Sequence, residues 1–311
     1  MQAKNIYMNY SIIIPHKNTP DLLKRCIDSI PQRKDLEIII VDDNSSDNIV
    51  DFDNFPGLHR ENTTVIFNKE GKGAGNARNI AIPKAKGRYI IFADADDFFN
   101  DCINDILDDY CMKNFDVVYF NANSVDSNTL EPSNRVDHLY DFFNIYNQNE
   151  NEGLLYFRYM FTEPWCKIVS RNIIINNNIQ FGHTKVNQDV VYAINVGDKS
   201  KNIIIDKRQG YCVTSRNDSL CKTDTKKTNE ERFYVHSLWN MFLQERGIKL
   251  TIPRFEYMMY LMSQMLYKDP KQFIERYRIL RNNRYSHYWI VSKTLSNVLF
   301  TVKIKINKIF D

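Results

Sequence analysis

Three carboxylates stand together in residues 89–100, which read YIIFADADDFFN. Asp94, Asp96 and Asp97 come directly after a run of apolar and aromatic residues that is typical of a buried strand. Carboxylates this close repel one another, and each raises the pKa of its neighbour unless a positive charge lies between them. A divalent cation would supply that charge. A solvated acidic turn that caps a helix near Asn100 is the alternative.

Apolar runs and helix-like stretches alternate through the first 125 residues. Strands are predicted over 10–15, 36–43, 63–68, 88–94 and 116–123, and helices over 19–30 and 73–85. Strands that are apolar on both faces and separated by helices indicate a parallel sheet between helix layers. Polar segments follow four of them, with the sequences PHKN, DDNSSD, NKEGKGAGNARN and DADD. Because parallel sheets bind ligands at the carboxyl ends of their strands, we expect a binding site at this edge.

The residues after these strands have the chemistry to hold a nucleotide diphosphate. Asp43 can accept a hydrogen bond from a base N–H, and Arg78 can meet a phosphate. Asp94 and Asp96 can hold a hydrated Mg²⁺ or Mn²⁺ that bridges phosphates. The glycines of GKGAG (residues 71–75) permit close backbone approach, although this stretch is not a GxxxxGK[ST] phosphate loop. Each motif is weak alone, and their combination on one edge carries the prediction.

Composition places the chain among globular proteins. Of its 311 residues, 43% are hydrophobic and 25% are charged, which excludes a disordered or fibrous chain. The six cysteines form no CxxC pair and no regular framework, so we expect reduced thiols in a cytoplasmic protein. The N-terminal apolar run is too short for a signal peptide, and no stretch reaches the roughly 18 apolar residues of a membrane span.

Charge is distributed unevenly along the chain. Residues 268–311 hold ten Lys or Arg against three acidic residues, a net charge of +7, whereas the whole chain carries +3 and the remainder therefore −4. In this tail, apolar residues recur at helical spacing: Tyr288, Val291, Leu295, Val298, Leu299 and Val302. Together with the basic end KIKINKIF, they resemble an interfacial helix suited to an anionic membrane. Packing onto the body or onto a second subunit is the alternative.

The second half of the chain has a less regular pattern. It predicts helices at both ends of 139–161, a short helix in 170–181, a helix over 187–198 and a strand or hairpin over 202–219. A helical pattern continues over 230–281 with breaks at Gly247 and Pro253. The polar segment 222–231 is the predicted domain boundary. We therefore expect an α/β domain over residues 1–221 and a helical C-terminal region over 222–311 that ends in the basic amphipathic tail.

Taken in order, four segments resemble the inverting family 2 glycosyltransferases of the GT-A fold. They are SIIIPHKNTPDLLKRCIDSI, EIIIVDDNSSD, NARN before KGRYIIFADADD, and, more faintly, NQDVVYAINV. The resemblance covers roughly residues 8–215. It implies a GT-A type nucleotide-binding sandwich with a mostly parallel central sheet. In that fold, residues 1–100 would form the nucleotide-binding half and residues 101–221 the acceptor half.

The same resemblance implies roles for single residues. Pro15, His16 and Lys17 would line the base and ribose pocket. Asp43 would recognise the uracil edge, and Arg78 would lie near the base and the phosphates.

The acidic residues would act on the diphosphate and on the acceptor. Asp94 and Asp96 would form the DxD motif, with Asp96 preferred as the direct metal ligand and Asp94 closer to the ribose. Asp97 would support these ligands or cap the next helix. The family usually has Glu-Asp where this chain has Gln188 and Asp189, so the usual general base is retained at Asp189.

The chemistry of inverting transfer supports this base independently. Such an enzyme needs a base on the sugar face opposite the leaving diphosphate and a cation that takes up charge as the phosphate–sugar bond breaks. Asp189 opens a predicted helix after a polar turn, and a helix N-cap is its alternative role. Trp165 in TEPWCK could stack on a sugar face or belong to the core. His138 and His183 lack ligand spacing to another His or Cys, so they do not indicate a metal site.

The sequence therefore predicts a metal-dependent, inverting glycosyltransferase that uses Mn²⁺ or Mg²⁺. We expect it to move a hexose from a UDP-sugar to a hydroxyl of a glycan or lipid-linked glycan in surface polysaccharide synthesis, with no nucleic acid partner. Its expected location is the cytoplasm, peripheral at the inner face of the cell membrane. One alternative is a phosphoryl-transfer enzyme that uses DADD as nucleophile and acid, although that pair normally follows the first strand of its domain. The other is a non-catalytic scaffold that binds a sugar nucleotide or a lipid.

Overall fold

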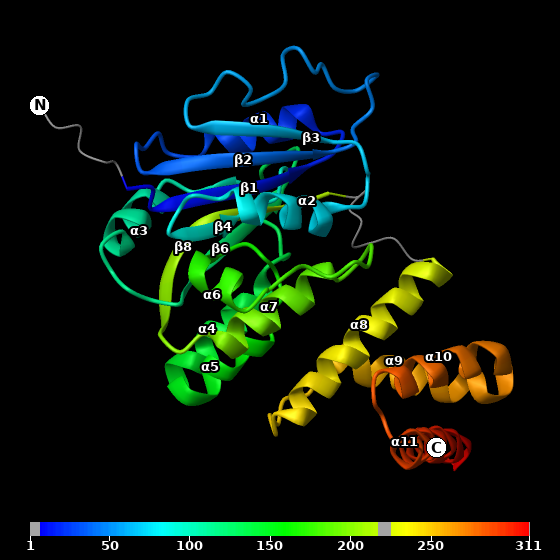
Figure 1. The fold of residues 1–311 in the computed structure, drawn as a ribbon. Helices are drawn as coiled ribbons and strands as arrows, with labels where there is room; N and C mark the ends of the chain where they lie inside the picture. The colour runs from blue at the N-terminus through cyan, green and yellow to red at the C-terminus, as the bar shows by residue number, and fades with distance from the viewer. Residues whose placement is uncertain (1–6, 217–224, 311) are drawn as a thin grey trace, which may run out of the picture. The chain divides into compact units, whose positions relative to one another are not determined.

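The computed structural model describes residues 7–216 and 225–310, with side chains through residue 300. The chain divides into two compact units, Met1–Lys222 and Thr223–Asp311, drawn from blue to green and from yellow to red in Figure 1. The first residues of the predicted boundary segment (222–224) lie outside the described residues, as do the side chains of the tail residues Val302, Lys303, Lys305 and Lys308.

The described part of the first unit is built on one eight-stranded sheet. Its strands are β1 (Tyr10–His16), β2 (Leu36–Asp43), β3 (Thr63–Asn68), β4 (Tyr89–Phe92), β5 (Phe98–Phe99), β6 (Val117–Asp126), β7 (Lys167–Ser170) and β8 (Ile203–Ser215), in the spatial order β3-β2-β1-β4-β7-β6-β8-β5. Parallel pairing joins β3, β2, β1 and β4, and also β6 with β8. β7 runs antiparallel to both of its neighbours, and β5 runs antiparallel to β8.

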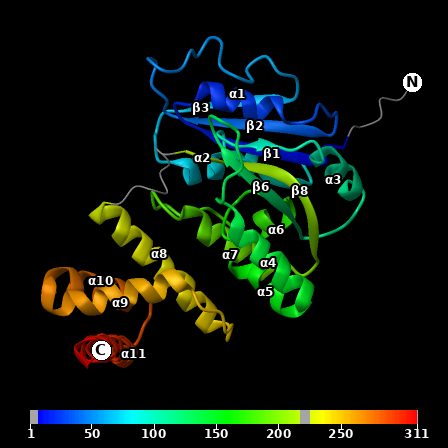
Figure 2. The ribbon, with the colours of Figure 1, turned by 180° about the vertical axis from the view of Figure 1, so that it is seen from behind.

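Helices cover both faces of this sheet (Figures 1 and 2). They are α1 (Pro20–Asp28), α2 (Ala74–Ala81), α3 (Ile103–Tyr110), α4 (Asp137–Gln148), α5 (Glu150–Tyr159), α6 (Arg171–Asn176) and α7 (Gln188–Lys199), with a 3₁₀ turn at Ile82–Lys84. α1 and α3 lie on one face, where Arg33 after α1 pairs with Asp108 of α3 at 2.5 Å. α2 and α7 lie on the other, where the Phe92 ring of β4 meets the Tyr192 ring of α7 edge-on at 5.2 Å.

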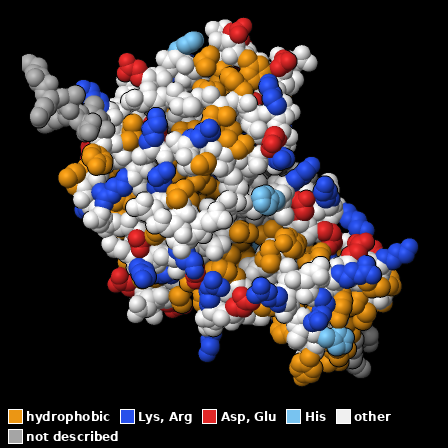
Figure 3. Space-filling model, in the orientation of Figure 1, with side chains coloured by type: hydrophobic (Ala, Val, Ile, Leu, Met, Phe, Trp, Pro, Cys, Tyr) orange, Lys and Arg blue, Asp and Glu red, His pale blue; other side chains and the backbone are white. Residues whose placement is uncertain are grey.

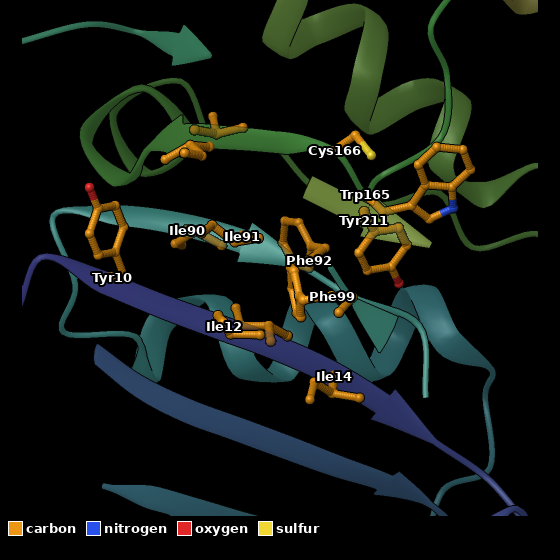
Figure 4. Close-up of a cluster of buried hydrophobic side chains, with 14 of the residues drawn as sticks. Tyr10, Ile12, Ile14, Ile90, Ile91, Phe92, Phe99, Trp165, Cys166 and Tyr211 are labelled. Atoms are coloured by element: carbon orange, nitrogen blue, oxygen red, sulfur yellow. The ribbon is translucent and has the colours of Figure 1, made fainter. Parts of the chain in front are cut away.

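The central strands are buried because they are apolar on both faces. Every residue of β1, β2 and β4 is buried. Figure 4 shows Ile12 and Ile14 of β1 in one buried cluster with side chains of the neighbouring strand β4, where Ile91 is the partner of Ile12. Burial of each such side chain contributes about 1.5–3 kcal/mol relative to exposure. These strands therefore form a rigid platform for the residues at their carboxyl ends.

The order of the strands differs from the simple parallel array that the alternating pattern predicts. The predicted strand over 116–123 is present as β6, but it does not pair with β4. The short antiparallel strand β7 lies between them, with Val169 opposite both Ile90 and Val117. β7 comes later in the chain, and hydrophobic periodicity predicts that a strand exists without predicting its neighbours.

The second unit consists of helices in its described residues. They are α8 (Lys226–Glu245), α9 (Pro253–Lys268), α10 (Pro270–Asn282) and α11 (His287–Phe310). The predicted breaks are observed at Gly247, which has a φ of 65°, and at Pro253. A further break was not predicted: Asp269 accepts a hydrogen bond from the Gln272 N–H and begins α10. Within the described residues, no helix combines the length and the apolar character that crossing a bilayer requires.

Candidate active site

The carboxyl ends of β1, β2, β3 and β4 meet at one edge of the sheet because these strands run parallel. The register places His16 of β1 opposite Asp42 of β2, and Asp43 of β2 opposite Asn68 of β3. The acidic cluster follows β4, whose last residue pairs with Ile13 of β1. The four polar segments predicted to meet at one edge therefore do so.

The buried side chain of His16 connects the ends of β1 and β2 at this edge. It is 1% exposed, its Nδ1 lies 2.8 Å from Asp42 Oδ1, and its Nε2 accepts a hydrogen bond from the Thr19 N–H at 3.1 Å. Burial alone would raise the pKa of Asp42, but the contacts with His16 and Ser45 outweigh it and lower that pKa. Both ring nitrogens are therefore engaged within the protein. The prediction that His16 contacts the base or ribose is corrected: its side chain instead holds the ends of β1 and β2 in place.

The other two residues of this predicted group differ in exposure. Pro15 is buried within β1, whereas Lys17 is exposed directly after the strand. Lys17 is therefore the member of the group whose side chain is free to reach a ligand at the edge.

Asp43 holds the glycine-containing loop between β3 and α2. Its Oδ2 accepts a hydrogen bond from the Gly73 N–H at 2.7 Å, and its Oδ1 accepts one from Asn68 Nδ2 at 3.1 Å. Gly73 has a φ of 96°, a conformation that side chains with a Cβ rarely adopt. Asp43 is 2% exposed in this arrangement. Recognition of a uracil edge by Asp43 stays a prediction that would use the remaining lone pairs of its oxygens.

Gly75 brings the start of α2 close to the start of α7. A Cβ at Gly75 would lie 2.6 Å from Gln188 Oε1 and 3.1 Å from the Gly182 carbonyl oxygen. Asn187, with a left-handed φ of 56°, precedes this contact. The amide of Gln188 therefore fills the space beside the glycine loop, and this contact places the next residue, Asp189, at the same edge.

The acidic cluster has the donor set of a cation site. Ligand atoms of Asp94, Asp96 and Asp97 all lie within 4.8 Å of one another. Burial, followed by the charge of Asp94, raises the pKa of Asp96, and burial with the charges of its two neighbours raises that of Asp97 well above its usual range. Oxygen ligands suit Mg²⁺ and Mn²⁺, and a cation would offset this concentration of negative charge.

Guanidinium groups meet two of these carboxylates. Arg78, 4% exposed, pairs through Nη2 with Asp94 Oδ1, and its contact with the phosphates stays a prediction. Arg216, at the end of β8, places Nη2 at 2.9 Å from Asp96 Oδ2. No motif in the sequence indicates Arg216 as a site residue. Arg25 of α1 donates from Nη2 to the Asp96 carbonyl oxygen at 2.6 Å and thereby fixes the backbone of the cluster.

Asp97 differs from its two neighbours. It is 3% exposed, and its Oδ1 accepts a hydrogen bond from the Thr214 N–H at 2.7 Å. The helix that follows, α3, begins at Ile103 and has no side-chain cap. The cluster therefore does not cap this helix, which removes the alternative explanation for it, and Asp97 supports the turn from inside.

Asp189 lies in the first turn of α7, where Asn187 is the N-cap. The N-cap alternative for Asp189 is therefore wrong. Burial raises the pKa of Asp189 to about 6, and the charge of Glu163 acts in the same direction, while Arg78 opposes both. A carboxylate with a raised pKa is a stronger base, which suits proton removal near neutral pH.

Trp165 belongs to the core. It is 6% exposed and stacks on Tyr211, with 5.9 Å between ring centroids (Figure 4). The Tyr211 hydroxyl accepts a hydrogen bond from the Asp94 N–H at 2.9 Å. Of the two predicted roles of Trp165, stacking on a sugar is therefore wrong and a place in the core is right. The ring supports the acidic cluster through Tyr211.

A second polar group, which no sequence motif indicates, acts electrostatically on Asp189. Glu163, in the loop before β7, pairs through Oε1 with His138 Nε2 at 3.0 Å. Lys167, 1% exposed, donates from Nζ to the Glu163 carbonyl oxygen and lies 3.7 Å from the centroid of the Phe161 ring. Burial lowers the pKa of Lys167 to about 8, against the opposing charges of Glu163 and Asp189. No spacing in the sequence links these residues.

Comparison with known proteins identifies the family. A family model described as "Glycosyl transferase family 2" matches residues 11–176, more than half of the chain. The chain belongs to this family. This confirms the resemblance found in the ordered motifs, and a family member is expected to be a glycosyltransferase enzyme.

Named relatives of this family act in glycan synthesis. The poly(ribitol-phosphate) beta-glucosyltransferase of Bacillus spizizenii is 30% identical over 210 residues, which are 66% of this chain and 32% of the relative. The UDP-Glc:alpha-D-GlcNAc-diphosphoundecaprenol beta-1,3-glucosyltransferase WfaP of Escherichia coli is 41% identical over 91 residues, 29% of this chain and 36% of the relative. The chain thus spans about a third of the length of these curated relatives.

Solved structures confirm the fold class. Residues 1–349 of S. aureus TarS in complex with UDP-GlcNAc superpose with a TM-score of 0.59 and 18% identity, covering 89% of this chain and 79% of that one. The mannosyltransferase PcManGT from Pyrobaculum calidifontis, in complex with GDP-Man and Mn²⁺, gives a TM-score of 0.50 and 13% identity, covering 95% and 75%. The α/β class with a GT-A type sheet and C-terminal helices is therefore confirmed.

Proposed function

We propose that this family 2 glycosyltransferase transfers a hexose, with inversion, from a UDP-sugar to a hydroxyl of a glycan or lipid-linked glycan acceptor. The proposal includes a divalent cation, Mn²⁺ or Mg²⁺, and a place in the synthesis of a surface polysaccharide. The names of the relatives support the acceptor class and the pathway. UDP is favoured over other nucleotides because the name of WfaP includes UDP-Glc and because TarS was solved with UDP-GlcNAc and with UDP.

The observation that carries the proposal is the position of a base and an acidic cluster at one sheet edge. Asp94 and Asp96 follow β4, and Asp189 lies where Gln188 packs against Gly75. Arg78 acts on both the acidic cluster and the base. It pairs with Asp94, and its positive charge opposes the rise in the pKa of Asp189. An anionic diphosphate and a neutral hydroxyl can therefore be held at adjacent places.

In the proposed reaction, Asp189 accepts the proton of the acceptor hydroxyl while that oxygen attacks C1 of the donor sugar. The bond between C1 and the β-phosphate oxygen breaks, and UDP leaves with the electron pair of that bond. Because attack and departure occur on opposite faces, the configuration at C1 inverts. A carboxylate whose pKa is raised by burial suits this task, since it competes better for the proton than an ordinary aspartate.

Asp96 and Asp94 are the residues that would hold the cation, and both present oxygens that are partly exposed. When bound, the cation supplies positive charge to the leaving diphosphate. Arg78 and Arg216 already lie at these carboxylates and would neutralise the remaining charge of the phosphates. Asp97 is the less favourable ligand of the three, because it is 3% exposed and its Oδ1 accepts from the Thr214 N–H.

Two alternatives from the sequence have less support. A phosphoryl-transfer enzyme would need Asp94 or a neighbour as nucleophile after the first strand, whereas the cluster follows β4 of a family 2 domain. A non-catalytic scaffold would have no use for Asp189 beside the donor edge. We therefore retain transfer as the function to be tested.

The test is a donor panel. The purified full chain is incubated with Mn²⁺ and, separately, UDP-glucose, UDP-galactose, UDP-N-acetylglucosamine and GDP-mannose, and release of the free nucleotide is measured. Turnover of a UDP-sugar that stops with chelator supports the proposal. Turnover of GDP-mannose alone would contradict the nucleotide assignment, and release of phosphate from a sugar phosphate without nucleotide turnover would favour phosphoryl transfer.

We further propose that the protein is cytoplasmic and associates peripherally with the inner face of the membrane through α11. One face of this helix packs inward, with Ile290 and Thr294 at most 4% exposed, while Lys293 pairs with Glu256 of α9 at 2.6 Å. The opposite face is apolar and exposed at Tyr288 (82%), Leu295 (53%) and Leu299 (68%), among others.

This exposed apolar face lies next to positive charge. Figure 3 shows hydrophobic side chains beside Lys and Arg at the lower right of the view, over α11. The chain continues with three further lysines, at positions 303, 305 and 308. An anionic lipid surface matches both properties, because apolar side chains enter the acyl boundary while lysines meet the headgroups.

A further inference from the structure

Glu163 has an oxygen without a hydrogen-bond partner. Its Oε1 meets His138, but in the described part of the chain its Oε2 is shielded from solvent and accepts no hydrogen bond. A shielded polar atom without a partner destabilises a protein, so proteins rarely keep one without a reason. The side chains of Glu163 and His138 are otherwise 26% and 41% exposed, so the pair is partly open to solvent, and a small rotation of the carboxylate would present Oε2 to a ligand.

The loop that carries Glu163 is held firmly beside the acidic cluster. The Lys167 ammonium donates to the Glu163 carbonyl oxygen, and Trp165 stacks on Tyr211, whose hydroxyl accepts from the Asp94 N–H. Between them, Cys166 has a φ of 58°, a left-handed conformation that persists only where the surroundings enforce it. Glu163 is thus built into the architecture of the active site.

The charge of Glu163 also acts on the proposed base, Asp189. This charge is the largest contribution from any charged group to the raised pKa of Asp189. Burial would raise the pKa of Glu163 itself, but the contact with His138 and the charge of Lys167 lower it. Glu163 is therefore a carboxylate at neutral pH, and its free oxygen is a strong hydrogen-bond acceptor.

We propose that Glu163 binds the acceptor, its Oε2 accepting a hydrogen bond from a hydroxyl adjacent to the one that Asp189 deprotonates. The inference rests on the proposed function. Of the groups that meet at this site, the diphosphate brings negative charge and is repelled, whereas sugar and polyol hydroxyls bring the donors that the oxygen lacks. The acceptor class that follows is a sugar or polyol with two neighbouring hydroxyls.

The hydroxyls of the transferred hexose are a second source of the same chemistry. We assign the contact to the acceptor because Asp189 is the group proposed to meet the acceptor, and the loop that carries Glu163 is held at the same edge through Trp165 and Tyr211. The experiment separates the two sources by measuring the donor and the acceptor independently.

The experiment compares wild type with Glu163→Gln in the full chain. The donors are UDP-glucose and UDP-N-acetylglucosamine with Mn²⁺ at pH 8, where Asp189 is ionised in both proteins. The acceptors are p-nitrophenyl glycosides of glucose, galactose and N-acetylglucosamine, and ribitol 5-phosphate. We expect the acceptor KM to rise about tenfold or more, as for the loss of a hydrogen bond to a charged group. Donor KM and donor hydrolysis without acceptor should stay within about threefold.

Monodeoxy derivatives of the best acceptor provide a second measurement that misfolding cannot imitate. Wild type should discriminate about tenfold against the derivative that lacks the neighbouring hydroxyl, and Glu163→Gln should lose that discrimination. The control is Glu150→Gln, which removes an exposed carboxylate at the other end of α5 that accepts from the Tyr146 hydroxyl at 3.1 Å. It should leave both KM values unchanged.

Three outcomes would overturn the inference. An unchanged acceptor KM in Glu163→Gln would show that the carboxylate binds nothing, and an increase in donor KM alone would move the contact to the transferred hexose. Equal discrimination by both proteins against every deoxy derivative would exclude the hydrogen bond. If wild type instead turns over no sugar nucleotide, the proposed function itself fails, and this result is distinct from all three.

Discussion

Arg216 and Asp96 form an ion pair across the edge of the sheet, with 2.9 Å between Nη2 and Oδ2. Arg78 and Asp94 pair in the same way beside it. Both carboxylates proposed to hold a cation are therefore already matched with guanidinium groups. An incoming cation has to compete with these partners, and the phosphates of a nucleotide would take them over. Cation and nucleotide are thus expected to bind together.

The first prediction follows from this coupling. UDP binding should require Mn²⁺ or Mg²⁺ and should weaken at least about tenfold in Asp96→Ala, because the charge of the diphosphate is then left without its cation. Titration calorimetry with and without chelator measures both effects. Asp105→Ala is the matched control, since Asp105 is exposed on α3 outside the acidic cluster and should keep UDP affinity within about threefold. Equal affinity with and without the cation would end the metal assignment.

The second prediction concerns the base. Asp189→Asn should retain UDP binding and lose transfer by about 10² to 10⁴-fold, because an amide cannot accept the acceptor's proton. Initial rates at saturating donor and acceptor measure the loss. Asp198→Asn, on the same helix and paired with Lys199 at 3.0 Å, is the control that should keep its activity. A rate for Asp189→Asn within about threefold of wild type would place the base elsewhere.

The third prediction is the pH dependence of transfer. Asp189 works only as a carboxylate, and its pKa is raised to about 6, so kcat/KM for the donor should fall about tenfold per pH unit below 6 and level off above it. The charged groups that act on Asp189 are Glu163, Asp94 and Arg78, and the first two keep its pKa high. Removing a negative charge in Glu163→Gln should therefore move the acid limb to lower pH.

Rates between pH 4.5 and 9, in buffers of constant ionic strength, test this sign. A limb that stays at the same pH in Glu163→Gln would show that Glu163 does not act on the base. A limb that moves to higher pH would contradict the direction of the charge effect.

The donor edge could be predicted from the sequence because parallel pairing brings strand ends together. Asp43 ends β2, Arg78 lies in the helix that follows β3, and Asp94 and Asp96 follow β4. Their meeting therefore needed no long-range information. The exposure of these residues could not be predicted in the same way. His16 also stands at a strand end, yet it is 1% exposed because Asp42 and the Thr19 N–H hold both ring nitrogens.

The acceptor side depends on contacts between distant segments, which no spacing reveals. Arg216 reaches Asp96 because β8 pairs parallel with β6, and Glu163 meets His138 because the loop before β7 lies beside the start of α4. β7 itself enters the sheet antiparallel, between strands that precede it in the chain. Local sequence patterns therefore predict one half of the site, whereas the residues of the other half are brought together only by the fold.

The final prediction is that α11 binds anionic membranes. Each basic residue near such a surface contributes about 1 kcal/mol, and we count only the three lysines at 303, 305 and 308, because Lys293 is paired with Glu256. The exposed face of Tyr288, Leu295 and Leu299 adds apolar burial at about 25 cal/mol per Å². The anchor should therefore be reversible and should weaken with salt, because lysine–headgroup attraction is screened.

Co-sedimentation with vesicles of phosphatidylcholine, with and without phosphatidylglycerol, at low and high salt, measures this binding. The variant is Leu295→Asn with Leu299→Asn, which changes the exposed face and leaves the buried Ile290 in place, so the helix should still pack on α9. Tyr257→Asn with Leu266→Asn is the control, since both side chains are exposed on α9, at 60% and 45%. Wild type and the control should pellet with anionic vesicles at low salt, and the α11 variant should not. If wild type stays in the supernatant, or if both variants bind equally, the exposed face of α11 serves another purpose and the peripheral location is wrong.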